Sequence, residues 1–464
     1  MATERAPSLP PEMFSFVLRH GDYSKAGLRL GQLTVQGRSA ISTPSLVIPT
    51  SRGVIPHITQ DTVSKLTRLS AVYVALEDFI ERSPSKSPIF RQNPSPPNSK
   101  LRDFIALPDQ CLSILGPRRI PAIETPNQNS NSSIAICTSV GFQLLNVDDY
   151  VQSAQDLGPD ITIGPADIVT TKQVSQKRME KSADRTHAWT RDTLAVEPEN
   201  KESALFASLP PLEPQRQSFY LSDLTEEYKG QVAGLSTYSA ETAASLQNTL
   251  EDLPRLCLNN PINPHELLRV IALGNDLVTT PFVTETSENG IAMDFRFAVS
   301  YEARNQKLGI DLWDNAHATD VSPLVKGCGC YTCTKHHRAY LHHLLSAKEM
   351  LAWTLLQIHN FSIMEDFFEA IRESVRKGTF EEQSKAFARA YDPEMPRPTG
   401  EGPRIRGYQM KSVGGGEPKK NRKVYGRLDE QARKLEEAES GIATPEEDVN
   451  AKDIEKLGLG EVQN

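Results

Sequence analysis

The chain has 464 residues, which is longer than most single domains but within the range of one α/β barrel with insertions. Its hydrophobic content of 38% is sufficient for a sizeable core, and its 32 prolines predict many loops. A formal net charge of −8 argues against a dedicated nucleic-acid-binding protein, although a local basic surface is not excluded. No stretch approaches eighteen apolar residues and no signal-like segment opens the chain, so the sequence predicts a soluble intracellular protein without an integral membrane segment.

The first part of the chain predicts strands. "LRLGQLTVQGRSAISTPSLVIPTS" (28–51) alternates β-branched and polar residues between glycines, which is typical of a hairpin followed by a buried strand at 45–49. Two tracts rich in Pro, Ser and Asn, at 83–100 and 124–133, have no periodicity and are predicted to be exposed insertions.

Between about 145 and 300, helical patterns alternate with short apolar runs. The helical patterns are "VDDYVQSAQDLG" and "NPHELLRVIALGN", and the apolar runs are "DITIG", "QVAGLS" and "RLCLN". This alternation predicts a parallel sheet, either open or closed into a barrel. From about 395 the chain becomes rich in Pro, Gly and charge, so 395–464 is predicted to be a charged, disordered tail whose removal from 398 onward leaves folding intact. Its basic run "KKNRK" (419–423) is predicted to be a solvated linker, with a nucleic-acid phosphate contact or a nuclear address as the alternatives.

Three cysteines and four histidines lie within "KGCGCYTCTKHHRAYLHH" (326–343). The spacing of Cys328, Cys330 and Cys333 allows thiolates to converge on one ion, as in zinc knuckles. Because thiols stay reduced inside cells, the cluster indicates a metal site. The remaining cysteines, at positions 111, 137 and 257, are typical of ordinary core residues.

The fourth ligand is left open by the residue pattern. His336 and His337 are the local candidates, while His342 and His343 follow on a helix predicted from 334 to 350. His359 is the distant candidate; on one straight helix it would lie roughly 39 Å from Cys333, at about 1.5 Å per residue. It can therefore bind only if the helix breaks and folds back.

A resemblance to a known family favours the distant histidine. "CGCYTC" followed by "RAYLHHLLSAKEMLAWTLLQIHN" closely resembles the zinc subdomain of the tRNA-guanine transglycosylase family, whose pattern is C-x-C-x-x-C and then a His within L-H-N. The resemblance implies that Cys328, Cys330, Cys333 and His359 bind one Zn²⁺. A closed Cys₃His set leaves no position for water, so this zinc would be structural.

The resemblance extends, more weakly, over most of residues 15–385. It is carried by "TPSLVIPTSRGVIPHIT", "LGPDITI", "VAGLS" and "LPRLCLNNPINPHELLRVIALGNDL". It implies an α/β fold: an irregular (β/α)₈ TIM-type barrel within 1–394, with a C-terminal zinc-binding helical subdomain at about 310–385 and the disordered tail at 395–464.

The family exchanges a guanine in tRNA for a 7-deazaguanine base, which requires a carboxylate nucleophile and an acid/base group. Aligning Gly274 and Asp276 with the family's G-x-D places Thr279 at the nucleophilic aspartate and Glu285 at an arginine. An unassisted threonine hydroxyl is a poor nucleophile at neutral pH. Asp276 is not expected to replace it, because three residues along a strand span about 10 Å and reach the opposite face.

The other family carboxylates are not clearly matched either. "SVGFQ" (139–143) resembles the family's D-S-G-G-F-Q but is expected to be a decoy, because the next family motif follows it too closely. The counterpart should lie near "LPDQCLSILGPRR" (107–119), where Asp109 is a weak candidate. Asp167 aligns with the base-recognition aspartate only after a one-residue shift, and a turn aspartate is the alternative.

Because it lacks these family carboxylates, the chain resembles the non-catalytic subunit that accompanies the catalytic subunit in eukaryotic members of the family. By resemblance, the chain would join a catalytic subunit in a heterodimer, meet tRNA through the complex, and support exchange of guanine for queuine at the wobble position of GUN-anticodon tRNAs. The same resemblance implies a cytoplasmic location with peripheral association with the mitochondrial outer membrane. The alternative is an autonomous base-exchange enzyme or another barrel hydrolase that uses Asp276, Asp167 or Glu285.

Overall fold

The computed structural model describes residues 13–19, 27–80, 87–95, 98–125, 128–169, 175–196, 203–246, 250–299 and 304–403. The tail beyond 403, with its basic run, lies outside the described residues. The domain boundary near 394 therefore stays a prediction.

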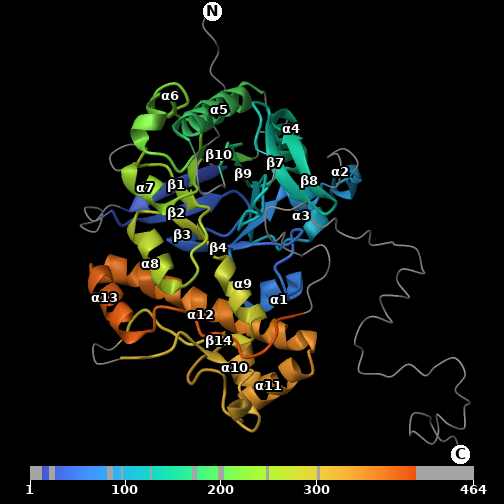
Figure 1. The fold of residues 1–464 in the computed structure, drawn as a ribbon, viewed down its shortest axis with the longest axis vertical. Coiled ribbons are helices and arrows are strands. Elements are labelled where there is room, and N and C mark those ends of the chain that lie inside the picture. The colour runs from blue at the N-terminus through green and yellow to red at the C-terminus, as the bar shows by residue number, and fades with distance from the viewer. Residues whose placement is uncertain are drawn as a thin grey trace, which may run out of the picture. The chain divides into compact units, whose positions relative to one another are not determined.

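Eight parallel strands form a closed barrel, in which β13 pairs with β4. Figure 1 shows β4, β9 and β10 of this barrel with helices around them. In chain order the strands are β4 (Ser45–Pro49), β5 (Ala71–Ala75), β6 (Leu112–Gly116), β9 (Ile161–Ile163), β10 (Ala204–Leu209), β11 (Gly234–Thr237), β12 (Arg255–Cys257) and β13 (Leu277–Thr279). The predicted (β/α)₈ TIM-type barrel is confirmed. All eight carboxyl ends open at the same end of the barrel, where such folds carry their chemistry.

Helices cover the outside of the barrel. They are α1 (Gln60–Leu66), α2 (Pro88–Arg91), α3 (Lys100–Ile105), α4 (Val147–Leu157), α5 (Gln176–Ala195), α6 (Ser218–Thr225), α7 (Ala240–Ser245), α8 (Pro264–Ala272) and α9 (Pro281–Glu288), with short 3₁₀ turns η2 (Leu76–Asp78) and η4 (Pro214–Gln217). In β5, Ala71 and Tyr73 belong to the cluster that fills the barrel, whereas Val72 and Val74 pack in the cluster shared with the helices. This two-residue alternation explains why the strands are buried on both faces.

A small antiparallel sheet closes the amino-terminal end of the barrel. Its strands are β1 (Phe14–Arg19), β2 (Leu30–Val35) and β3 (Ile41–Thr43), so the hairpin and the buried strand predicted at 28–51 are confirmed. Leu33 and Ile41 pack into the barrel interior. Arg38 forms an ion pair of 2.8 Å with Asp160, which immediately precedes β9.

Both tracts predicted to be exposed contribute to the packed structure. The first contains α2, whose Ile89 side chain is completely buried. Within the second, Asn129 is 7% exposed and its amide donates to Asp167 at 2.7 Å. The chain then forms the hairpin β7 (Ser133–Thr138) and β8 (Gly141–Asn146), so "SVGFQ" spans a hairpin turn and does not follow a barrel strand.

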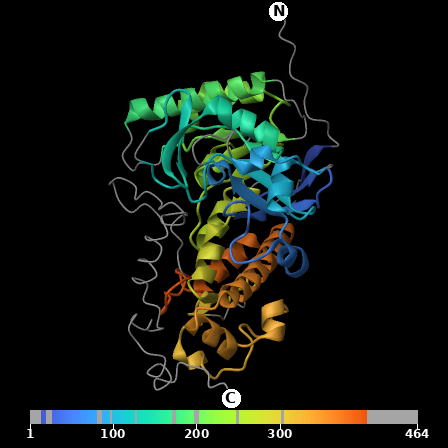
Figure 2. The same ribbon diagram turned by 90° about the vertical axis from the view of Figure 1, so that its right-hand side faces the viewer.

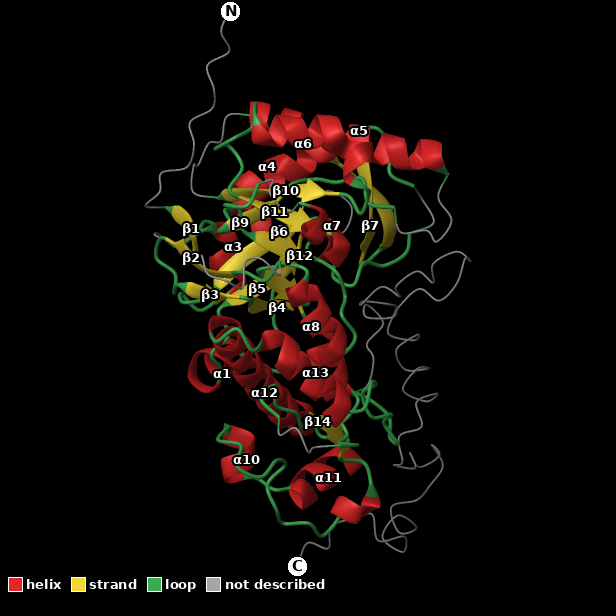
Figure 3. Ribbon diagram, turned by 90° about the vertical axis from the view of Figure 1, so that its left-hand side faces the viewer, coloured by secondary structure: helices red, strands yellow, loops and turns green. Residues whose placement is uncertain are grey.

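A helical subdomain follows the barrel. It contains β14 (Ile291–Met293), β15 (Gly309–Asp311), η5 (Asn315–His317), α10 (Tyr331–Lys335), α11 (Arg338–Ser346), α12 (Met350–Arg376) and α13 (Phe380–Ala390). Helix α12 packs on α9 and β14 and reaches β4, and in Figures 2 and 3 it lies between the barrel and the short helices α10 and α11. Within the described parts of the chain, no helix is both long and apolar enough to span a membrane.

Candidate functional site

Two short helices, α10 and α11, and the long helix α12 bring His359 back to the cysteines. The helix predicted over 334–350 is instead broken at His336 and His337, and the chain turns again at Lys348, whose φ is +54°. Helices α10 and α11 then both pack on α12, which carries His359. The helix break that the distant ligand requires is therefore present.

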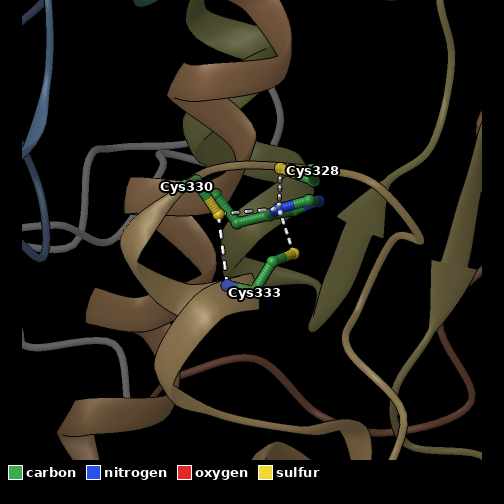
Figure 4. Close-up of side chains that lie close together, drawn as sticks. Cys328, Cys330 and Cys333 are labelled. Atoms are coloured by element: carbon green, nitrogen blue, oxygen red, sulfur yellow. Dashed lines mark hydrogen bonds between the residues drawn. The ribbon is translucent and has the colours of Figure 1, made fainter.

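The four side chains meet at one point (Figure 4). The Nδ1 atom of His359 lies 3.8 Å from Sγ of Cys328, 3.5 Å from Sγ of Cys330 and 3.4 Å from Sγ of Cys333. For a tetrahedral zinc with Zn–S near 2.3 Å and Zn–N near 2.05 Å, the S–N edge would be about 3.6 Å. The donor set therefore fits a tetrahedral metal ion, and it is the only such group of His, Cys and carboxylate ligands within the described ranges.

The orientation of His359 also suits a metal ligand. Its Nε2 lies 2.9 Å from the carbonyl oxygen of Met293, which favours a proton on Nε2 and leaves the Nδ1 lone pair facing the sulfurs. The ring is completely buried. Next to it, Asn360 accepts from the backbone N–H of Met293 at 2.8 Å, so two consecutive residues of α12 hold β14.

The thiols of the cluster favour the protonated, positively charged form of His359. Burial alone would lower the pKa of His359, but contacts with Cys328 and Cys333 outweigh it and raise that pKa to about 9. The pKa of Cys328 is lowered, chiefly because the neighbouring thiols of Cys330 and Cys333 donate to its sulfur. The same hydrogen bonds raise the pKa of Cys330, so the lowered pKa belongs to Cys328 and not to the whole cluster.

The other histidines of the motif lie elsewhere. His336 stacks on Tyr340 with ring centroids 5.2 Å apart, and His337 accepts from the backbone N–H of Tyr340 at the start of α11. His342 lies 2.9 Å from the carbonyl of Leu312, and His343 is exposed. Outside the cluster, Cys111 and Cys257 are buried as predicted, whereas Cys137 is only half-buried.

Thr279 lies at the carboxyl end of β13 and is completely buried. Its hydroxyl donates to the backbone carbonyls of Asn259 at 2.8 Å and Cys257 at 3.2 Å. These two bonds hold β13 against β12, and neither contact supplies a base to the hydroxyl.

Asp276 lies at the opposite end of the same strand. Its carboxylate is 3.3 Å from the guanidinium of Arg29 and accepts from the backbone N–H of Arg255 at 2.8 Å. Burial raises its pKa, and these two arginines counteract the rise. Because Asp276 precedes β13 and Thr279 ends it, the structure does not bring Asp276 to the mouth of the barrel. Glu285 lies on α9 and not on a strand.

Asp167 follows β9 at the mouth of the barrel and is completely buried. Both of its oxygens lie 2.6 Å from the guanidinium of Arg178, and Arg185 adds a contact of 3.0 Å. Together with the donation from Asn129, these contacts occupy both carboxylate oxygens. Asp167 therefore acts as a buried ion-pair acceptor that anchors α5.

Sequence reasoning missed the charged residues that follow β5 and β6. Directly after β6 the chain places Arg118 and Arg119, where Arg119 pairs with Asp78 and donates its backbone N–H to Glu77 at 2.7 Å. The "GPRR" at the end of an apolar run was the available signal. Asp109 instead precedes β6, and its backbone carbonyl faces Arg38 from the amino-terminal end.

A family model described as queuine tRNA-ribosyltransferase matches residues 24–393 of the chain. A relative from Schizosaccharomyces pombe is 34% identical over 399 residues, covering 83% of this chain and 87% of the relative. The chain belongs to this family. The resemblance drawn from the cysteine motif is thereby confirmed for the whole of the described barrel.

The relatives carry one common description. The Schizosaccharomyces pombe protein is named queuine tRNA-ribosyltransferase accessory subunit 2, as are proteins from Drosophila mojavensis and Anopheles gambiae. Each of the two insect proteins is 27% identical to this member of the family, over 76% of the chain.

Proposed function

We propose that this chain is the non-catalytic accessory subunit of a heterodimeric queuine tRNA-ribosyltransferase. It would support the exchange of guanine for queuine at the wobble position of GUN-anticodon tRNAs, meeting tRNA through the complex. The resemblance that motivates this proposal also implies a cytoplasmic complex, with peripheral association with the mitochondrial outer membrane.

The observation that carries the proposal is the state of Thr279. At the position aligned with the nucleophilic aspartate, the chain has a buried hydroxyl bonded to two carbonyls. The carboxylate of Asp167, which follows β9 on the opposite side of the barrel, is neutralised by two arginines, and Asp276 lies at the other end of the barrel. Base exchange through a covalent intermediate requires a free carboxylate, which these contacts do not provide.

For the cysteine cluster we propose one structural Zn²⁺ bound by Cys328, Cys330, Cys333 and His359. The S–N distances and the outward hydrogen bond of His359 support this assignment. Such an ion supplies folding free energy to the helices around it, on the order of 10 kcal/mol. With all four positions filled by protein ligands, the chain itself provides no site for a metal-bound water.

The partner surface is proposed to include the metal-binding subdomain. Several large apolar side chains there are exposed, which is expensive unless a partner covers them. Val321 and Met350 are each 76% exposed, and Leu351 and Tyr331 are about 40% exposed. The bound zinc would hold these helices in the arrangement that the catalytic subunit recognises.

Base exchange by purified proteins tests the proposal. The chain alone should release no guanine from GUN-anticodon tRNA, and a catalytic subunit from the same cell should gain activity when the chain is added. Exchange by the chain alone would overturn the accessory assignment and favour an autonomous enzyme. A chain that neither exchanges bases nor binds or activates the catalytic subunit would overturn the role in the complex.

A further inference from the structure

After α13 the chain stays in contact with the rest of the protein. Residues 391–402 are called the strap, and the first of them contact the start of helix α8. The side-chain amide of Asn263 donates to the carbonyl of Pro393 at 3.1 Å, and Nε2 of His265 lies 2.9 Å from the carbonyl of Asp392. The backbone of Asp392 also donates to the carbonyl of Gln306 at 2.8 Å. The start of the strap is thereby fixed to α8 and to the segment that leads into β15.

The second half of the strap holds β15. The backbone N–H and the hydroxyl of Thr399 both donate to one carboxylate oxygen of Asp311, at 2.9 and 2.7 Å. Gly400 lies so close to Trp313 that an added Cβ would be 2.1 Å from Cδ2 of the indole. On another side, a Cβ on Gly290 would be 2.2 Å from Nε1 of the same ring, so the indole is held between two glycines.

The contacts with Asp311 and Trp313 are important for the strap, because part of its length borders a cavity and does not pack against a hydrophobic core. A cavity of about 1070 Å³ lies beside it, lined by strap residues and by polar side chains such as Asp294, Arg296 and Lys326. The hydrogen bonds to Asp311 and the packing on Trp313 attach this half of the strap to β15 and to the segment that follows it.

From β15 the connection continues to the metal cluster. Strands β14 and β15 are antiparallel, with Ile291 opposite Asp311 and Met293 opposite Gly309. A Cβ on Gly309 would lie only 2.7 Å from the carbonyl oxygen of Ala292, so a shift of β15 would displace β14. Met293 in turn provides the carbonyl that accepts from His359.

We propose that the strap positions His359 for metal binding by fixing the β14–β15 ribbon through Asp311 and Trp313. This inference rests on the proposed metal site. Loss of the hydrogen-bond partner of a metal-binding histidine typically costs about 10–100-fold in metal affinity. Because the strap acts through the ribbon, we expect a smaller effect, roughly 3–10-fold faster metal release.

The test compares two valine substitutions in the full zinc-loaded chain. Gly400→Val places a side chain into Trp313. Glu401→Val introduces valine at the next position, where the native side chain is 84% exposed and pairs with Lys348. The rate of zinc transfer to a chromophoric chelator should rise several-fold for Gly400→Val and stay within about twofold of wild type for Glu401→Val. In Co²⁺-loaded protein, the ligand-field absorption bands should shift for Gly400→Val alone, which general destabilisation would not produce.

A milder variant keeps the inference testable if Gly400→Val fails to fold. Thr399→Val retains size and the backbone hydrogen bond to Asp311 but loses the hydroxyl donation, so release should be about two- to threefold faster. A wild-type release rate in Thr399→Val, and in Gly400→Val where it folds, would overturn the strap inference and leave the metal site standing. A wild-type chain that binds no zinc would instead refute the proposed metal site.

Discussion

Thr279 is expected to contribute to the stability of the chain but not to base exchange. The hydroxyl stabilises the packing of β13 on β12, so Thr279→Ala should lower stability by roughly 1–3 kcal/mol by leaving two buried carbonyls with fewer donors. The assembled complex should nevertheless keep base-exchange activity within a few-fold of wild type. Thermal melting and exchange kinetics on the same sample separate the two effects. A loss of about a thousandfold in turnover would mean that Thr279 takes part in the chemistry.

Glu365 on α12 gives stability a predictable pH dependence. Burial raises its pKa to about 7, against the opposing contacts of Arg68, whose backbone N–H donates to the carboxylate at 2.6 Å. The folded state therefore binds a proton more tightly than the unfolded state, whose carboxyl has the ordinary pKa of about 4.5. The stabilising effect of this proton is fully present below that pKa and is lost as pH rises through 7.

We therefore expect Glu365→Gln to change the pH dependence of stability. Between pH 8 and pH 6 the wild type should gain on the order of 1 kcal/mol from this site, and the glutamine variant should not. The measurement is the difference in melting temperature between the two proteins at each pH, which cancels effects that they share. A constant difference across this range would show that the carboxyl is already ionised at pH 6.

The roles of some residues could be predicted from the sequence, whereas the roles of others could not. His359 could be selected through the family spacing, but residue pattern alone could not exclude His336 or His337, because the break before α11 has no glycine or proline to signal it. Arg178 and Arg185 are equally unmarked: an arginine on an amphipathic helix reads as exposed, and only the fold brings it to Asp167.

At the scale of elements, local patterns predicted regular elements well and irregular segments poorly. The strands β2 to β4 and the helices α4 and α8 follow directly from their hydrophobic periodicity and their glycine or asparagine boundaries. The tract at 83–100 lacks periodicity, yet it buries Ile89, because one apolar side chain can fill a gap between α3 and α4 without producing a repeat. Residues 398–403 also lack a hydrophobic signal, because Gly400 packs against Trp313 without contributing an apolar side chain.

The contacts of the strap determine how much a C-terminal truncation should lower the melting temperature. Removing 404–464 should leave the melting temperature within about a degree, because it leaves every strap contact described above in place. Removing 398–464 should lower it by several degrees, since it also deletes the hydrogen bonds to Asp311 and the packing on Trp313. Differential scanning calorimetry of the two truncations decides the matter. Equal melting temperatures would show that residues 398–403 add nothing to stability, and a large drop for the shorter deletion would show that the tail itself packs.

At the scale of the whole molecule, the metal site should couple folding to assembly. His359 joins α12 both to the cysteine turn and to β14, so His359→Ala releases the exposed helices α10 and α11 from their shared anchor while leaving the barrel strands untouched. We expect zinc content per chain and co-purification of the catalytic subunit to fall together. His187→Ala, a histidine on α5 outside both the cluster and the strap, should change neither, and His336→Ala should keep its zinc.

Measuring metal by atomic emission and partner by quantitative pull-down across these three variants separates the alternatives. Zinc retained by His359→Ala but lost from His336→Ala would place the fourth ligand locally. Zinc lost with full partner binding would show that the metal serves only the fold, because the catalytic subunit would then recognise a surface that does not depend on the arrangement of α10 and α11. Loss of both from His359→Ala alone is the outcome that the geometry predicts, since the same ring that would complete the metal site also ties the exposed subdomain to the barrel.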